Sequence, residues 1–261
     1  SGVSIAAGQT FAEAGVPAIG CSCTNPQVTL GNDFYFRTCF LDPFQGTVMA
    51  SYAAEEMGYK TAAIISQNGD DYSTGIAAYF KQAFESLGGT IVADETYQTN
   101  ESDFNAILTS VKESGAEVVF IPCSIATATL ILPQAQANGV TAQIIASDTW
   151  ENESIVMAAG SAAEGVVFST FFDENDESTP MAKDFVNGFK AYLNADAQRI
   201  TLNGGTDGVA AVSALGYDAY MTMVAALADL DGVEGDLTSV NLRDALVTVN
   251  HDGVTGNITF D

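Results

Sequence analysis

The sequence predicts an α/β protein with parallel sheets and two lobes. From residue 60 to about 195, apolar runs alternate with amphipathic segments joined by short connections, the pattern of a parallel sheet with covering helices. The apolar runs are mostly unbroken, as expected for strands buried on both faces. The strands expected in this block are residues 62–66, 90–94, 117–123, 143–148 and 165–172.

The ends of the intervening helices support this interpretation. Ser73 opens a helix that stops at Gly88, because glycine suits the left-handed C-terminal conformation. Gly115 closes the next helix in the same way, and Pro180 takes the first position of a later one. Each expected strand in this block is therefore followed by a helix or a short connection.

The flanking segments hold fewer strands. An apolar strand is expected at 16–19 and an extended piece at 34–38. Asp42 as N-cap, with Gln45 three residues later, predicts a capping box for the helix that ends near Gly58. The helices and the extended tail expected after residue 205 are 207–230, 240–249 and 256–260.

This organisation predicts a discontinuous chain. Residues 59–196 form lobe II, residues 1–58 and 197–261 pack together as lobe I, and the low-charge stretch 194–205 is the best linker candidate. The flanks hold one clear strand, too little for a complete sheet. Either lobe I is incomplete in this chain or another polypeptide completes it.

Composition restricts the classes of partner. The chain has 261 residues, of which 47% are hydrophobic, enough for a packed core. Its 33 acidic and 8 basic side chains give a net charge of -25, which excludes nucleic acid as a partner and disfavours an anionic membrane surface or a strongly anionic ligand. No run approaches the roughly 18 consecutive apolar residues of a membrane span.

Cysteine and histidine usage argues against a metal or redox cofactor. The four cysteines are Cys21, Cys23, Cys39 and Cys123, and His251 is the single histidine. These spacings do not fit a zinc site, so no metal or cofactor is expected and small buried thiols are the favoured interpretation. The even cysteine count permits disulfides, but the spacing does not demand them.

Polar residues at the ends of the apolar runs suit a small zwitterion. Ser22, Cys23 and Thr24 follow the first strand and offer hydroxyls and backbone N–H groups. Asp148 follows the strand at 143–146 and offers a carboxylate beside the aromatic face of Trp150. Together these loops could bind the two charged ends of an amino acid. The chain lacks a Gly-x-Ser-x-Gly elbow, a phosphate loop and a dinucleotide fingerprint, so an enzyme is not expected.

Short motifs occur in a fixed order over nearly the whole chain. They include Val16-Pro17-Ala18-Ile19, Thr24-Asn25-Pro26, Phe36-Arg37-Thr38, Phe44-Gln45-Gly46, Asp71-Tyr72-Ser73, Gly216-Tyr217-Asp218 and Gly253-Val254-Thr255-Gly256. In this combination the chain resembles the branched-chain amino acid (leucine, isoleucine, valine) binding family of type I extracellular solute-binding proteins, which deliver ligands to ABC importers. The resemblance implies the type I periplasmic-binding-protein fold, with two Rossmann-like lobes that close on a ligand in the cleft between them.

The resemblance also implies a carboxylate site in lobe I. Local alignment places it at Ser1, Ser22, Cys23 and Thr24. The alternative for Ser22 and Thr24 is a turn whose hydroxyls cap their own backbone. Arg37, a tempting anion clamp, is expected instead in a structural ion pair.

Lobe II is expected to hold the ammonium group and the side chain of the ligand. Asp148 matches the family's ammonium acceptor, with an N-cap role as the alternative, and Tyr72 matches a residue that closes over the ligand, with packing on its own helix as the alternative. Trp150 suits a rigid aromatic wall beside the ammonium site, with ordinary packing within the lobe as the alternative. Ser124 stands where relatives often carry a larger aromatic residue, which leaves room for a bulkier ligand.

The resemblance predicts an extracytoplasmic, non-catalytic receptor that binds a branched-chain or otherwise apolar amino acid and presents it to a membrane permease of an ABC transporter. The alternative is a ligand-sensing domain of a regulator or receptor with the same fold. Family members begin with a further strand-helix-strand-helix-strand run, so a companion N-terminal fragment is a further candidate partner.

Overall fold

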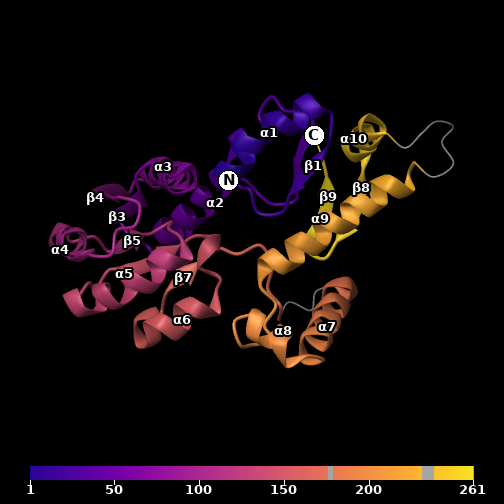
Figure 1. Cartoon of the computed structure of the whole chain (residues 1–261). Coiled ribbons are helices and arrows are strands. Elements are labelled where there is room, and N and C mark those ends of the chain that lie inside the picture. The colour runs from indigo at the N-terminus through magenta and orange to yellow at the C-terminus, as the bar shows by residue number, and fades with distance from the viewer. Residues whose placement is uncertain (176–178, 231–237, 261) are drawn as a thin grey trace. The chain divides into compact units, whose positions relative to one another are not determined.

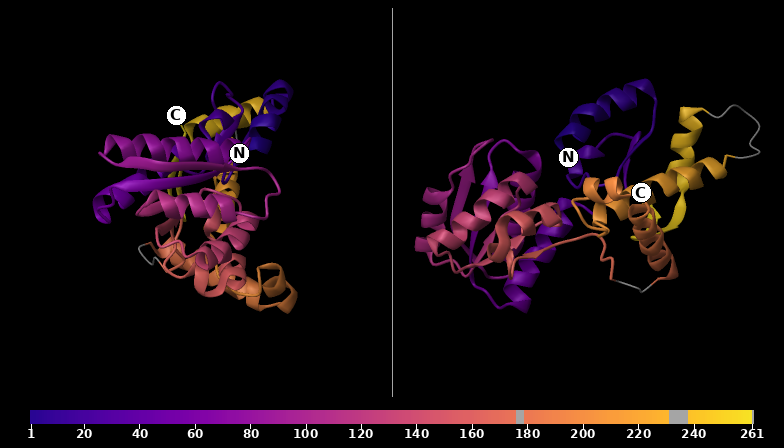
Figure 2. Two further views of the ribbon diagram at one scale, coloured as in Figure 1. Left: turned by 90° about the vertical axis from the view of Figure 1, so that its left-hand side faces the viewer. Right: turned by 60° about the horizontal axis from the view of Figure 1, so that its bottom comes forward.

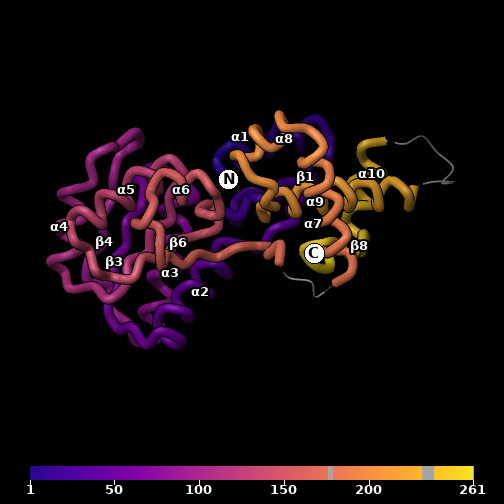
Figure 3. The backbone as a smooth tube through the Cα atoms, turned by 90° about the horizontal axis from the view of Figure 1, so that it is seen from below, coloured from indigo at the N-terminus to yellow at the C-terminus, as the bar shows by residue number. Residues whose placement is uncertain are grey.

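The computed structural model describes residues 1–175, 179–230 and 238–260. The chain forms two compact units (Figure 1). Unit 1 comprises Ser1–Phe40 and Phe171–Asp261, and unit 2 comprises Leu41–Thr170. The backbone therefore passes from one unit to the other twice, as the colour ramp of Figure 3 shows.

Unit 2 is built on a parallel sheet of five strands in the order β4-β3-β5-β6-β7. All five strands expected from the apolar runs are present, with β4 longer and β5, β6 and β7 shorter than expected. Their bounds are β3 Thr61–Gln67, β4 Thr90–Tyr97, β5 Val118–Phe120, β6 Gln143–Ala146 and β7 Val167–Phe168. Ile64 pairs with Phe120 and Phe120 with Ile145, so the centre of the sheet is entirely apolar.

Helices cover both faces of this sheet (Figures 1 and 2). Ala63, Ile65 and Val119 pack on one side with helical residues such as Leu108 and Ile131. Alternate strand residues pack on the other side with Met49, Ile76, Phe80 and Phe84. The first side is covered by α4 (Asn105–Ser114), α5 (Ile125–Asn138) and α6 (Glu153–Ala159), and the second by α2 (Asp42–Ser51), a π-helical turn (Tyr52–Glu56) and α3 (Asp71–Ser86).

Unit 1 contains less sheet. Its N-terminal part is α1 (Gly2–Ala14), β1 (Ala18–Gly20), a 3₁₀ turn (Pro26–Val28) and β2 (Tyr35–Arg37), with β1 and β2 paired in parallel. Its second segment forms α7 (Pro180–Asn194), α8 (Ala197–Leu202), α9 (Ala211–Ala228) and α10 (Ser239–Thr248), followed by the antiparallel pair β8 (Asn250–Gly253) and β9 (Gly256–Thr259). The long helix expected at 207–230 therefore begins at Ala211.

Helix α9 is long and apolar enough to cross a membrane by length and composition, with a mean hydropathy of 1.3. One face of α9, which includes Ala214, Asp218 and Thr222, is buried. Asp218 is fully buried and accepts hydrogen bonds from the backbone N–H groups of Val254 and Thr255, both at 2.8 Å, and from the Thr255 hydroxyl at 2.6 Å. This carboxylate anchors the turn between β8 and β9 to α9.

The unit boundaries differ from those expected. Residues 41–58 belong to unit 2 because α2 packs closely on α3: a Cβ added to Gly46 would lie 2.8 Å from the backbone nitrogen of Phe80. Residues 171–196 belong to unit 1 because Phe172 and Val186 pack with Val209. The expected linker at 194–205 contains α8.

The expected capping box is also wrong. Helix α2 has Leu41 at its N-cap without a side-chain cap, and Asp42 lies in the first turn. Gln45 is fully buried, and its amide bonds another part of unit 2. The predicted start of the helix is therefore correct, but the predicted role of Gln45 as a capping residue is wrong.

Candidate functional site

The residues predicted to bind a ligand from lobe II lie at the carboxyl ends of the unit 2 strands. Since the five strands are parallel, their carboxyl ends share one edge of the sheet. Tyr72 lies in the first turn of α3 after β3, Ser124 follows β5, and Asp148 follows β6. Hydrogen bonds join these loops: Ser73 Oγ donates to the Pro122 carbonyl at 2.6 Å, and Thr149 Oγ1 donates to the Cys123 carbonyl at 2.7 Å.

Asp148 is the centre of this edge. The Tyr72 hydroxyl donates to Asp148 Oδ1 at 2.6 Å, and Gln45 Nε2 donates to the same oxygen at 2.8 Å. Gln45 Oε1 in turn accepts from the backbone N–H of Asp148 at 3.0 Å. Among the residues that the structure describes, no donor bonds Oδ2. Both side-chain donors to the carboxylate are therefore neutral, and the contacts of the described residues give it no cationic partner.

Burial affects the ionisation of both Asp148 and Tyr72. Burial raises the pKa of Asp148 above its usual value, although the hydrogen bonds from Tyr72 and Gln45 act in the opposite direction. Burial also raises the pKa of Tyr72, and the neighbouring Asp148 carboxylate adds to the effect. Tyr72 is therefore a neutral donor. A partly buried carboxylate without a cationic partner is costly, and a bound ammonium group would remove that cost.

Gln45 is the supporting residue that the sequence interpretation missed. Besides its two contacts with Asp148, its Oε1 accepts a hydrogen bond from Ser169 Oγ at 2.8 Å. Gln45 thus joins α2, the loop after β6 and the residue just after β7. A signal was available in the sequence, because Gln45 shares a helical face with Met49 and Ala53, which are buried.

Trp150 and Ser124 have structural roles in unit 2. Trp150 is 3% exposed and packs in the core cluster that includes Cys123 and Ile155. Ordinary packing, the alternative weighed above, describes this position, and a ligand contact stays a prediction. Ser124 is exposed at the N-cap of α5, where its Oγ accepts from the backbone N–H of Thr127 at 3.3 Å. Its place beside a predicted side-chain pocket also stays a prediction.

In unit 1, the loop after β1 carries the residues predicted to hold a carboxylate. Thr24 is fully buried, and its hydroxyl has no hydrogen-bond partner among the described residues. Ser22 is exposed, and Cys23 is buried. Ser1 Oγ accepts from the backbone N–H of Asn25 at 3.1 Å, which brings the first residue to this loop. Because the Thr24 hydroxyl bonds nothing in the described part of the chain, the turn-capping alternative is disfavoured for that residue.

Arg37 orients this loop. Its guanidinium donates to the carbonyls of Cys23 and Asn25, both at 2.8 Å, and to the Thr29 hydroxyl. The expected ion pair is therefore wrong, because the acceptors are carbonyl and hydroxyl oxygens. The peptide bonds of the described residues are trans, so the N–H of Thr24 points away from the side on which the Cys23 carbonyl meets Arg37.

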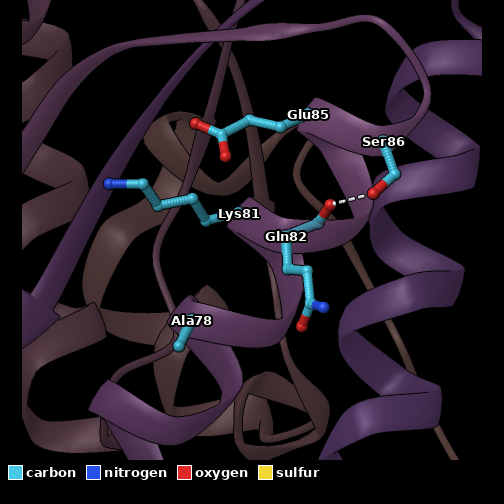
Figure 4. A pocket seen from close by; sticks show the side chains of 5 residues that line it. All are labelled: Ala78, Lys81, Gln82, Glu85 and Ser86. Atoms are coloured by element: carbon cyan, nitrogen blue, oxygen red, sulfur yellow. Dashed lines mark hydrogen bonds between the residues drawn. The ribbon is translucent and has the colours of Figure 1, made fainter.

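A shallow hollow of about 500 Å³ on α3 is not a candidate for this site (Figure 4). Its lining residues all come from one helix and are Ala78, Lys81, Gln82, Glu85 and Ser86. Lys81 pairs with Asp94 at 2.8 Å, and Ser86 Oγ bonds the Gln82 carbonyl at 2.7 Å. Since α3 begins at the carboxyl edge of the sheet, residues 78–86 lie toward its other end.

Comparisons with known proteins agree with this architecture. The family model described as periplasmic binding protein matches residues 1–261. A Leu/Ile/Val-binding protein homolog 3 of Brucella melitensis is 31% identical over 78% of this chain and 54% of its own length. A leucine-, isoleucine-, valine-, threonine-, and alanine-binding protein of Pseudomonas aeruginosa is 29% identical over 96% of this chain and 62% of its own. The chain thus spans little more than half the length of these relatives.

Solved structures give the same result. A leucine binding protein, LivK, of Thermotoga maritima matches with a TM-score of 0.89 and 30% identity over 100% of this chain and 70% of its own. LivJ of Streptococcus pneumoniae, solved in complex with isoleucine, matches with a TM-score of 0.86 and 30% identity over the same shares. The chain belongs to the periplasmic binding protein family and has its type I fold. Within that family it belongs with the branched-chain amino acid-binding proteins, which are solute-binding proteins.

Proposed function

We propose that this chain is the amino-acid-binding part of an extracytoplasmic solute receptor that serves an ABC importer. The observation that carries the proposal is the Asp148 carboxylate, whose Oδ1 accepts two neutral hydrogen bonds while Oδ2 has no donor among the described residues. A protonated amine is the ligand group that such a site favours, because it supplies both a hydrogen bond and the missing positive charge.

The proposed ligand is an α-amino acid. Its ammonium group binds Asp148, and Tyr72 fixes the carboxylate that receives it. Its carboxylate binds the hydroxyls and backbone N–H groups of Ser22, Cys23 and Thr24, with Ser1 beside them. The buried hydroxyl of Thr24 supports this assignment, because it has no partner among residues 1–175, 179–230 and 238–260 and a buried hydroxyl without a partner is unfavourable.

The side chain of the proposed ligand is branched-chain or otherwise apolar. The relatives named for leucine, isoleucine and valine support this choice, as does the relative solved with isoleucine. The proposed partner is the membrane permease of an ABC transporter, and the family supports an extracytoplasmic location. Ser124 and Trp150 belong to the proposed side-chain pocket.

Isothermal titration calorimetry against a panel of amino acids tests the proposal. Micromolar affinity, about 8 kcal/mol of binding free energy, is expected for one or more apolar amino acids, and Asp148→Asn is expected to weaken it by roughly 100-fold. Asp94→Asn is the matched control, because Asp94 is an exposed carboxylate paired with Lys81. A folded chain that binds none of the panel, or an Asp148→Asn variant with unchanged affinity, would contradict the proposal.

A further inference from the structure

Unit 1 contains a pair of buried cysteines that the proposed function does not use as thiols. Cys23 and Cys39 are 5% and 9% exposed, whereas the neighbouring Cys21 is more accessible. All four cysteines of the chain are thiols in the structure, and Cys123 is buried in unit 2.

The strand register brings Cys23 and Cys39 to the same place. Gly20 at the end of β1 pairs with Arg37 at the end of β2, and the Thr38 N–H bonds the Gly20 carbonyl at 3.2 Å. Cys39 follows Thr38 directly. Cys23 folds back over the end of β1, so that its Sγ lies 2.0 Å from the position of a Cβ added to Gly20. Only glycine at position 20 leaves room for this thiol.

Arg37 holds the Cys23 side of the pair in place. Its guanidinium bonds the Cys23 carbonyl at 2.8 Å from a position two residues before Cys39. The two cysteines therefore lie on segments that are fastened to each other by a strand pair and by a side-chain clamp. A hydrogen bond from the Cys39 side chain reaches Cys23, so the two thiols are neighbours in the folded chain.

We propose that Cys23 and Cys39 form a disulfide when the chain folds in the presence of a low-molecular-weight disulfide such as oxidised glutathione. One cysteine thiolate attacks a glutathione sulfur, which gives a mixed disulfide and releases one glutathione. The second cysteine then attacks the protein sulfur of that mixed disulfide and releases the other glutathione. The two protein thiols lose two electrons and two protons, and the two released glutathione molecules take up these electrons and protons.

The electrostatics of the pair favour this chemistry. A hydrogen bond from Cys39, together with the Arg37 charge, lowers the pKa of Cys23 from 9.0 to about 7, although burial opposes the shift. Near neutral pH a substantial fraction of Cys23 is therefore thiolate, the form that attacks a disulfide. In contrast, burial raises the pKa of Cys123 to about 12, so Cys123 is a poor competitor once unit 2 has folded.

The disulfide would fasten the loop that carries Ser22 and Thr24 to the end of β2. In that state Cys23 could serve a ligand through its backbone N–H only. By the chain-entropy argument, a crosslink that closes a loop of about 15 residues stabilises the folded state. For a chain of this size the expected rise in Tm is several degrees, and about 10 °C is the upper bound.

The test is refolding of the whole chain in a buffer of oxidised and reduced glutathione, followed by mass spectrometry and peptide mapping. The oxidised product should lose the mass of two hydrogen atoms, retain two of its four thiols, and yield one crosslinked peptide that joins Cys23 to Cys39. Its Tm should exceed that of the reduced chain by several degrees. Peptide mapping is carried out on the wild-type chain, so this part of the test does not depend on whether a variant folds.

Three variants make the test specific. Cys21→Ser should retain the crosslink, whereas Cys23→Ser and Cys39→Ser should each lose it. Retention of four thiols after oxidative refolding, or a map that joins Cys21 to either partner, would overturn the proposal. These results are independent of amino-acid binding, so failure here leaves the proposed function unaffected.

Discussion

Replacement of Gln45 tests the architecture around Asp148. Gln45→Ala removes three hydrogen bonds, to Asp148 Oδ1, to the Asp148 N–H and to Ser169 Oγ. At about 1 kcal/mol for each bond, with more where the buried carboxylate loses a donor, the free energy of unfolding should fall by about 4 kcal/mol. Gln82→Ala, on the exposed face of α3, should change it by less than about 0.5 kcal/mol.

Gln45→Glu adds a pH signature to this prediction. It replaces the Nε2 donor with a second carboxylate beside Asp148, so the pKa values of the pair are expected to rise in the folded state. The destabilisation should therefore be present at neutral pH and should diminish as the pH falls through those raised pKa values. Urea unfolding of the three variants and the wild type from neutral to acidic pH measures both effects. A Gln45→Ala cost no larger than that of Gln82→Ala, or a Gln45→Glu cost that grows on acidification, would refute the reasoning.

The remaining predictions concern Asp148 and Asp218. Asp148→Asn retains an acceptor for Tyr72 and Gln45 but removes a buried charge, so the ligand-free chain should be at least as stable as the wild type at neutral pH in urea unfolding. Burial raises the folded-state pKa of Asp148, so the difference in stability between the variant and the wild type should shrink as the pH falls through that pKa. An Asp148→Asn variant that is much less stable than the wild type at neutral pH would contradict the account. Asp218→Ala leaves three donors near the β8–β9 turn without their acceptor and should cost about 3 kcal/mol by the same measurement; a neutral result would show that α9 does not depend on this anchor.

The three middle strands of unit 2, β3, β5 and β6, could be predicted because most of their residues are buried between the two helical layers. Such a strand is an unbroken apolar run, and Ile64, Val119 and Ile145 belong to runs of this kind. Asp148 was identifiable for a related reason: an isolated carboxylate at the end of an apolar run needs a partner. Its contact with Tyr72 followed only from the shared edge of the parallel sheet.

Other features depend on contacts that local patterns do not encode. The Gln45–Asp148 hydrogen bond joins residues 103 positions apart. The sequence offered a local role for Gln45, in a capping box, and this hid its long-range role. The unit boundary at residue 40 was missed because the apolar face of α2 could cover either sheet; the close approach of Gly46 to α3 decides it. Cys23 and Cys39 likewise become a pair only through the register of β1 with β2.

The most direct test of the central claim is a thermodynamic cycle that pairs Asp148 with the ligand's ammonium group. Calorimetry would compare leucine with its des-amino analogue, 4-methylpentanoate, on the wild type and on Asp148→Asn. The account predicts that removal of the amine weakens binding to the wild type by roughly 100-fold, within the range of a buried charged hydrogen bond, and has little further effect on the variant. Equal losses on both proteins would contradict the assignment of Asp148 as the counter-ion of the ammonium group.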